Sequence, residues 1–204
     1  MPRITGPDIA THVARQEAAV LAAATELFAN RGYARVSMGD IADAVGLART
    51  SLYRYFPDKD HILLAWLRRD IGDLLDRSEQ VAADRVSLPL PEDRLRAWLT
   101  LQFGFLRNPE HALVMGLAAE MDAMGDEVRA EVVDQHVRLY ASVERIVADA
   151  IGSRPGTRRT TTVAAFVGGL LRTANELLSR GGSPEQVHRD FEAAALAVVQ
   201  AAAT

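Results

Sequence analysis

A short polar stretch, Arg49 to Tyr55, carries side chains that can hydrogen bond to the edges of nucleic-acid bases. Arg49 is followed directly by the hydroxyls of Thr50 and Ser51. A guanidinium can donate two hydrogen bonds to guanine O6 and N7, and small hydroxyls suit base edges or phosphate oxygens. Side chains of this kind at the start of a short helix suit insertion into the major groove. The stretch therefore indicates contact with double-stranded DNA.

Two short helices are predicted to position this stretch. The first has Ser37 as its N-cap and Asp40 as its capping-box partner, and Gly46 ends it. The second is expected over 49–56, because Pro57 cannot continue a helix. Two short helices joined by a tight glycine turn make a helix-turn-helix. The apolar residues expected to pack this pair onto the preceding helix are Ile41, Val45, Leu47, Leu52 and Phe56.

The stretch VSMGDIADAVGLARTSLYRYFPDKDHIL, together with the preceding ATELFANRGY, resembles the DNA-binding domain of the TetR family of bacterial transcriptional regulators. Its segment LYRYFPDK is close to a signature of that family. The resemblance implies that Arg49 and the two hydroxyls face bases, and that Tyr53 and Tyr55 contact phosphate or bases. Lys59 begins the next helix, where free N–H groups also favour an anion, so it is expected to grip phosphate. The residues expected at the DNA are Ser37, Met38, Arg49, Thr50, Ser51, Tyr53, Arg54, Tyr55 and Lys59.

Two positions depart from the family pattern, and other interpretations of the residues stay open. Ala48 stands where the family often has a capping Ser or Thr, a loss of about 1 kcal/mol. Gly39 lacks the longer polar side chain that is common there. A helix-turn-helix pattern alone can be mere packing in an all-helical protein. Tyr53 and Tyr55 can be boundary residues, and Arg54 can be a solvated surface charge.

The rest of the chain is predicted to be helical as well. Apolar residues recur at helical spacing and no run alternates as a strand does, so we expect an all-α fold of about nine helices. A three-helix DNA-binding domain over 1–57 precedes a larger bundle over 58–204. By the resemblance, this bundle holds a ligand cavity and a dimer interface. Clustered methionines suit an adaptable apolar pocket, although each can equally fill a gap in the core. The expected ligand-binding residues are Trp66, Trp98, Phe103, Phe105, Met115, Met121, Met124 and Tyr140.

The last two predicted helices, over 159–179 and from 184 to about 203, each carry an apolar stripe. Small residues beside the first stripe allow another helix to approach closely. The resemblance implies that both helices pair with their symmetry mates in an isologous four-helix interface, making a homodimer. The alternative is that both stripes are buried within one chain. The expected interface residues are Phe166, Gly169, Leu170, Phe191, Ala195 and Val198.

Composition excludes several classes of protein. The 204 residues are 49% hydrophobic and 25% charged, an ordinary globular balance. The absence of cysteine rules out disulfides, cysteine-ligated zinc, iron–sulfur clusters and a thiol nucleophile. Histidine spacings match no zinc pattern, and we expect neither a metal nor a cofactor. With a net charge of −4, DNA binding has to depend on where a few basic groups lie. No apolar run suits a membrane span or a secretory signal, so a cytoplasmic location is expected.

With the resemblance, these features predict a one-component transcriptional regulator, most simply a repressor. It would bind a near-palindromic operator as a dimer and be released by a small, largely apolar effector. No G-x-S-x-G, glycine-rich phosphate loop or H-E-x-x-H motif is present, so no enzymatic activity is expected. The alternative is an architectural or nucleoid-linked DNA-binding protein with the same fold and no small-molecule effector. The sequence leaves the operator, the regulated genes and the effector open.

Overall fold

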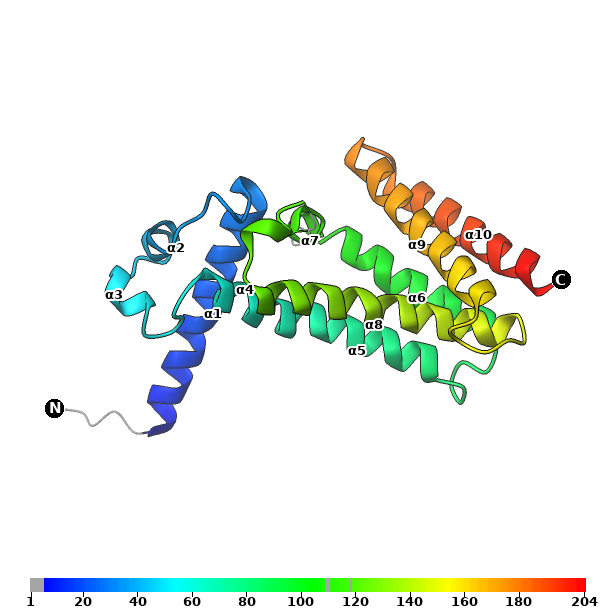
Figure 1. Cartoon of the computed structure of the whole chain (residues 1–204), viewed down its shortest axis with the longest axis horizontal. Coiled ribbons are helices and arrows are strands. Elements are labelled where there is room, and N and C mark those ends of the chain that lie inside the picture. Colours follow the sequence, from blue (N-terminus) through cyan, green and yellow to red (C-terminus); the bar gives the residue numbers. More distant parts are fainter. Residues whose placement is uncertain (1–5, 109–110, 118) are drawn as a thin grey trace. The chain divides into compact units, whose positions relative to one another are not determined.

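The chain folds almost entirely into helices. A computed structural model describes residues 6–108, 111–117 and 119–204, without the side chains of residues 6–9, 111, 112 and 115. These residues form ten α-helices, one π-helical turn and one 3-10 turn, and they contain no β-strand (Figure 1). The predicted all-α fold is therefore confirmed, with one α-helix more than the nine expected.

The helices group into two compact units. The first is Met1–Ile71 with Pro109–Val132, and the second is Gly72–Asn108 with Val133–Thr204. This grouping differs from the predicted boundary between residues 57 and 58. The helix that follows that boundary packs against the first helix of the chain, which places it in the first unit. As a division between DNA-binding and ligand-binding parts, the predicted boundary stays a prediction.

The first unit is built around a long N-terminal helix. This helix, α1 (Gly6–Arg31), contacts α2 (Met38–Val45), α4 (Lys59–Trp66) and α7 (His111–Leu117), while α3 (Arg49–Leu52) packs on α2 (Figure 1). Gly32, a left-handed glycine (φ 83°), follows the last residue of α1, and its N–H donates to the carbonyl of Phe28 at 2.9 Å. The unit also contains the π-helical turn η1 (Leu67–Ile71), the 3-10 turn η2 (Met121–Ala123) and the first residues of α8 (Asp126–Ala150).

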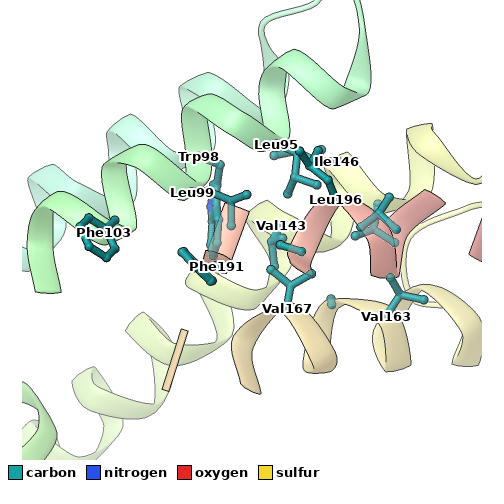
Figure 2. Close-up of a cluster of buried hydrophobic side chains, with 14 of the residues drawn as sticks. Leu95, Trp98, Leu99, Phe103, Val143, Ile146, Val163, Val167, Phe191 and Leu196 are labelled. Carbon is teal, nitrogen blue, oxygen red and sulfur yellow. The ribbon is translucent and has the colours of Figure 1, made fainter. Parts of the chain in front are cut away.

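The second unit is a bundle with one apolar core. It contains α5 (Gly72–Ala83), α6 (Pro91–Leu106), the remainder of α8, α9 (Arg158–Ser179) and α10 (Pro184–Ala203). Side chains from α6, α8, α9 and α10 converge in this core (Figure 2). The labelled members are Leu95, Trp98, Leu99, Phe103, Val143, Ile146, Val163, Val167, Phe191 and Leu196. In Figure 1, α9 and α10 run side by side, joined by a short turn.

Buried polar groups of the second unit are paired mainly across helices. The indole N–H of Trp98 donates to the hydroxyl of Ser142 at 2.8 Å. The guanidinium of Arg94 is buried, and it donates to the carbonyls of Leu88 and Pro89 and, at 2.7 Å, to the carboxylate of Asp149. These bonds fix the loop between α5 and α6 to the end of α8. No described helix is long and apolar enough to cross a bilayer.

Candidate nucleic-acid interface

The first helix of the predicted helix-turn-helix begins and ends at the predicted capping residues, Ser37 and Gly46. The hydroxyl of Ser37 accepts from the N–H of Asp40 at 3.2 Å, and the Asp40 carboxylate accepts from the N–H of Ser37 at 2.8 Å. Hydrogen bonds from the hydroxyl and backbone of Ser37 hold the pKa of Asp40 below its usual value. Gly46, in the left-handed conformation (φ 73°), ends α2. The capping box predicted from sequence is confirmed.

The second helix is shorter than predicted. The helix α3 ends at Leu52, and residues 53–55 form a turn in place of the expected continuation to residue 56. The N–H groups of Tyr55 and Phe56 both donate to the carbonyl of Leu52, at 2.9 and 3.1 Å. Leu52 and Phe56 are buried, so this turn is anchored at each side by a core residue. Ala48 provides no side-chain cap, as the sequence indicated.

The polar side chains of α3 and its turn face away from the core. Arg49, Thr50 and Arg54 are exposed, Ser51 and Tyr55 are half-buried, and Tyr53 is 44% exposed. The structure brings Arg49 and Tyr53 together: the guanidinium lies 6.0 Å from the ring centroid and its Nη2 lies 3.5 Å from the phenol oxygen. A guanidinium held over an aromatic ring loses less conformational freedom when it meets a ligand. This surface can therefore offer donors to an acidic polymer.

Two predicted DNA residues at the start of α2 have other roles in this structure. Met38 is only 7% exposed and belongs to the core, so its side chain is not available to DNA. This corrects the expectation for Met38, whose apolar side chain packs inward from the first turn of α2. Ser37 is exposed, but its hydroxyl is engaged with Asp40 in the capping box.

Lys59 lies where predicted, at the start of α4, but its ammonium points into the protein. Its Nζ donates to the carbonyls of Tyr33, Val36 and Ala34, at 2.9, 3.2 and 3.5 Å, and lies 4.2 Å from the centroid of the Tyr33 ring. Burial lowers the pKa of Lys59, and the Glu120 carboxylate opposes that shift. An ammonium has three donors. All three are directed at backbone carbonyls, so the structure does not favour the predicted phosphate contact.

The helix-turn-helix carries a local excess of positive charge in a chain whose net charge is −4. Between residues 31 and 56 there are four arginines and two aspartates. Arg31 pairs with Asp40 at 3.5 Å, whereas Arg35 is exposed on the turn before Ser37. Arg35 was not among the residues predicted at the DNA, although its position two residues before a helix N-cap was a usable signal.

The predicted ligand-binding residues do not form one cluster. Trp66, Met121 and Met124 belong to the first unit, and Trp98, Phe103, Phe105 and Tyr140 belong to the second. Met115 lies among the positions whose side chains are outside the described part. Trp66 is fully buried, and its indole N–H has no acceptor among the described residues. A cavity of about 250 Å³ in the second unit, between α6, α8 and α10, is lined by none of the predicted residues.

The predicted dimer residues divide between surface and core. Phe166 of α9 is 60% exposed, and Gly169 and Leu170 are partly exposed. Phe191 of α10 is buried in the core of its own unit (Figure 2). Ala195 is buried in the same core, and Val198 packs against it. The assignment of Phe191 and Ala195 to an interface is therefore wrong, since their apolar stripe is covered within the chain. Small exposed residues of α10, Ala193, Ala197 and Ala201, lie on its outer face instead.

Comparison with known proteins gives one consistent result. A model of the bacterial regulatory proteins of the tetR family matches residues 20–66. The HTH-type transcriptional regulator EthR of Mycobacterium tuberculosis is 30% identical over 146 residues, which is 71% of this chain and 65% of EthR. The chain thus spans just under two thirds of the length of this relative.

Solved structures of regulators share the fold. SCO4454, a TetR-family transcriptional regulator from Streptomyces coelicolor, superposes with a TM-score of 0.74 at 22% identity, covering 94% of this chain and 97% of that one. A transcriptional regulator from Saccharomonospora viridis in complex with choline gives a TM-score of 0.69 at 23% identity, covering 87% and 94%. At these identities the likeness establishes the fold alone.

Proposed function

Because the chain belongs to the TetR family of bacterial transcriptional regulators, we propose that it binds a near-palindromic DNA operator as a homodimer and represses transcription. A small, largely apolar effector would release it. One observation carries the proposal: α3 and the turn after it are anchored by buried Leu52 and present Arg49, Thr50 and Tyr53 outward. A helix held in this way can enter the major groove without disturbing the core.

Within this proposal, Arg49 reads a base and its neighbours hold the backbone. Arg49 would donate to guanine O6 and N7, and Thr50 and Ser51 would contact base edges or phosphate. Exposed Arg35 and Arg54 and the phenol of Tyr55 would contact phosphates. Two such surfaces about 35 Å apart would occupy successive major grooves on one side of the DNA.

The dimer would form through the outer faces of the last two helices. Phe166 and Leu177 are large apolar residues exposed on α9, and small residues lie beside them and along α10. Exposed apolar surface of this kind marks interaction sites on soluble proteins. Small side chains would allow α9 and α10 to approach the same helices of a second copy. An isologous contact then places the two DNA-binding surfaces symmetrically.

The effector would act by preferring one conformation of the dimer. A ligand shifts such an equilibrium only by its difference in affinity between the two states. The buried indole N–H of Trp66, which has no acceptor among the residues that the structure describes, could donate to an acceptor group on an otherwise apolar ligand. Choline in the Saccharomonospora viridis regulator supports a small organic molecule as the class of ligand. Protein of this kind would act in the cytoplasm, where the chromosome lies.

The test is selection of DNA from a random library by the full-length chain, followed by gel-shift competition. We expect one enriched palindromic sequence. Arg49→Ala should cost about 1 to 3 kcal/mol on that sequence and relax discrimination at one base position. Arg77→Ala, an exposed arginine of α5, is the matched control and should change nothing. Unaltered discrimination by Arg49→Ala would count against base reading. If no compound in a panel of apolar molecules releases the DNA, the alternative of an architectural DNA-binding protein without an effector would be favoured.

A further inference from the structure

Two segments far apart in sequence approach each other within the first unit. One is the turn between α1 and α2, residues 32–37, which leads directly into the helix-turn-helix. The other is residues 120–125, which contain η2 and end where α8 begins. The carboxylate of Glu120 accepts a hydrogen bond from the N–H of Ala34, with Oε2 and N 2.7 Å apart. A residue of one segment thus holds the backbone of the other.

A second carboxylate reaches in the opposite direction. Asp60, in the first turn of α4, accepts from the N–H of Gly125 at 2.9 Å. Its other oxygen accepts from the phenol of Tyr33, a buried residue of the α1–α2 turn. The two segments are therefore joined through two acids, each bonded to a backbone N–H some 65 or more positions away in the sequence.

Both contacts depend on a missing side chain. A Cβ on Gly32 would lie 2.8 Å from Oε1 of Glu120, and a Cβ on Gly125 would overlap Oδ2 of Asp60. In each case the carboxylate occupies the space that another residue type would fill. Gly32 also has a positive φ of 83°, which L-residues with a Cβ rarely adopt. The close approach is thus built into both segments.

Lys59 completes the arrangement from the position before Asp60. Its three donors are directed at the carbonyls of Tyr33, Ala34 and Val36, so the ammonium ties the same turn to the start of α4. Its charge also faces Glu120. Charge-assisted hydrogen bonds of this type are stronger than neutral ones. One cation and two carboxylates therefore converge on a single turn.

We infer that Lys59, Asp60 and Glu120 are positioning residues: they form a clasp that fixes the α1–α2 turn against residues 120–125, and a closed clasp is required for full DNA affinity. The inference rests on the proposed function, and it gives Lys59 a role other than phosphate contact. The physical reason is preorganisation. A helix-turn-helix whose entry turn is loose must lose conformational freedom on binding, and that loss weakens the complex.

The clasp also gives regulation a route. Residues 120–125 contain Met124, which is buried, and Met121, which is half-buried. A ligand that displaces these side chains pulls Glu120 and the N–H of Gly125 away from their partners. Such a ligand lowers DNA affinity to the extent that it prefers the open clasp.

The first experiment measures DNA affinity by fluorescence anisotropy on the sequence that the wild-type chain selects. Glu120→Ala removes one acid and should weaken binding at least fivefold. Glu120→Gln keeps an acceptor for Ala34 and should restore affinity to within about threefold of wild type. Asp122→Ala, which removes an exposed acid of the same segment, is the control and should stay within twofold.

A second pair of variants tests the other acid without removing any charge. Gly125→Ala pushes the Asp60 carboxylate aside, whereas the added Cβ of Gly116→Ala meets no atom of the described part of the chain within 4 Å. We expect at least fivefold weaker binding from the first and no change from the second. Circular dichroism establishes that each variant keeps its helix content.

Salt dependence separates positioning from phosphate contact. Losing one phosphate contact lowers the slope of log K against log salt concentration by about one. Lys59→Met should therefore weaken binding with an unchanged slope, and a slope reduced by about one overturns the role given to Lys59. If the wild-type chain binds its selected sequence and both Glu120→Ala and Gly125→Ala bind it with unchanged affinity, the clasp is overturned and the proposed function stands. If the wild-type chain selects no DNA sequence, the proposed function is overturned, and the role of the clasp in DNA binding is overturned with it.

Discussion

At the scale of single residues, the environment of a charged group decides what it contributes. Arg94 and Arg85 both donate to the carboxylate of Asp149. The Arg94 side chain is 2% exposed and that of Arg85 is 56% exposed. A buried guanidinium has lost its water and depends on its protein partners, whereas an exposed one exchanges them for solvent at little cost.

We therefore predict very different effects from the same substitution at these two positions. Arg94→Met leaves the carbonyls of Leu88 and Pro89 without their donor and should lower the free energy of unfolding by about 3 kcal/mol. Arg85→Met should lower it by less than about 1 kcal/mol. Urea unfolding followed by circular dichroism measures both. Equal losses of unfolding free energy would mean that burial does not set the strength of these two ion pairs.

A second residue-scale prediction concerns pH. The hydrogen bond that the imidazole of His61 donates to the Asp58 carboxylate raises the pKa of His61 above its usual value. A raised pKa means that the folded state holds the proton more tightly, so the stabilisation is complete below the ordinary histidine pKa and is lost as pH rises through the folded value.

His61→Gln should thus be less stable than wild type at pH 5.5, by roughly 0.2 to 1 kcal/mol, as for other exposed pairs. The difference should vanish by pH 8.5. Thermal unfolding at the two pH values checks this, and NMR titration of the imidazole gives the pKa itself. A gap that widens with pH would reverse the assigned sign.

At the scale of elements, local signals were predictable from the sequence and tertiary ones were not. The capping box at Ser37 and the glycine stop at Gly46 depend on a few neighbouring residues, and both are confirmed. The early end of α3 was not predictable from local helical propensity: burial of Phe56 was expected, but the turn at residues 53–55 that precedes it was not. The π-helical turn after α4 has no known sequence signal.

The predicted site shows the same limit. Exposure of Arg49, Thr50 and Tyr53 followed from the apolar spacing around them. The carbonyls that receive Lys59 lie more than twenty residues away in sequence, so its orientation could not be predicted. Likewise, an apolar stripe on α10 does not tell whether the same chain or a second one covers it, and for Phe191 the same chain does.

An element-scale prediction follows from the uncapped start of α3. Ala48 has the extended backbone conformation of an N-cap (φ −62°, ψ 140°) but no side-chain oxygen. Ala48→Ser should supply a hydroxyl oxygen that accepts from a backbone N–H in the first turn of α3, and it should raise the free energy of unfolding by about 0.5 to 1 kcal/mol. Ala44→Ser, an exposed position within α2, should instead be neutral or slightly destabilising. Chemical unfolding compares the two, and equal shifts would exclude a capping effect.

At the scale of the whole molecule, the proposed dimer makes the exposed face of α9 indispensable. Phe166→Arg places a charge where apolar surface would be buried twice, once for each copy. We expect a monomer at micromolar concentration by analytical ultracentrifugation and a large loss of operator affinity. Val86→Arg is the control: Val86 is 93% exposed, on the loop between α5 and α6, and its substitution should leave the mass unchanged. A dimeric Phe166→Arg would place the interface elsewhere.

The chain has a single lysine among its 204 residues, Lys59, and its ammonium is hydrogen-bonded to the backbone. Apart from the α-amino group, an acylating reagent therefore finds one primary amine, and that amine is engaged with three carbonyls. The rate at which mass spectrometry detects acylated Lys59 then reports how often its bonds break in the native protein. The acylation rate of Lys59 thus measures one local opening in the unmodified chain, with no background from other side-chain amines.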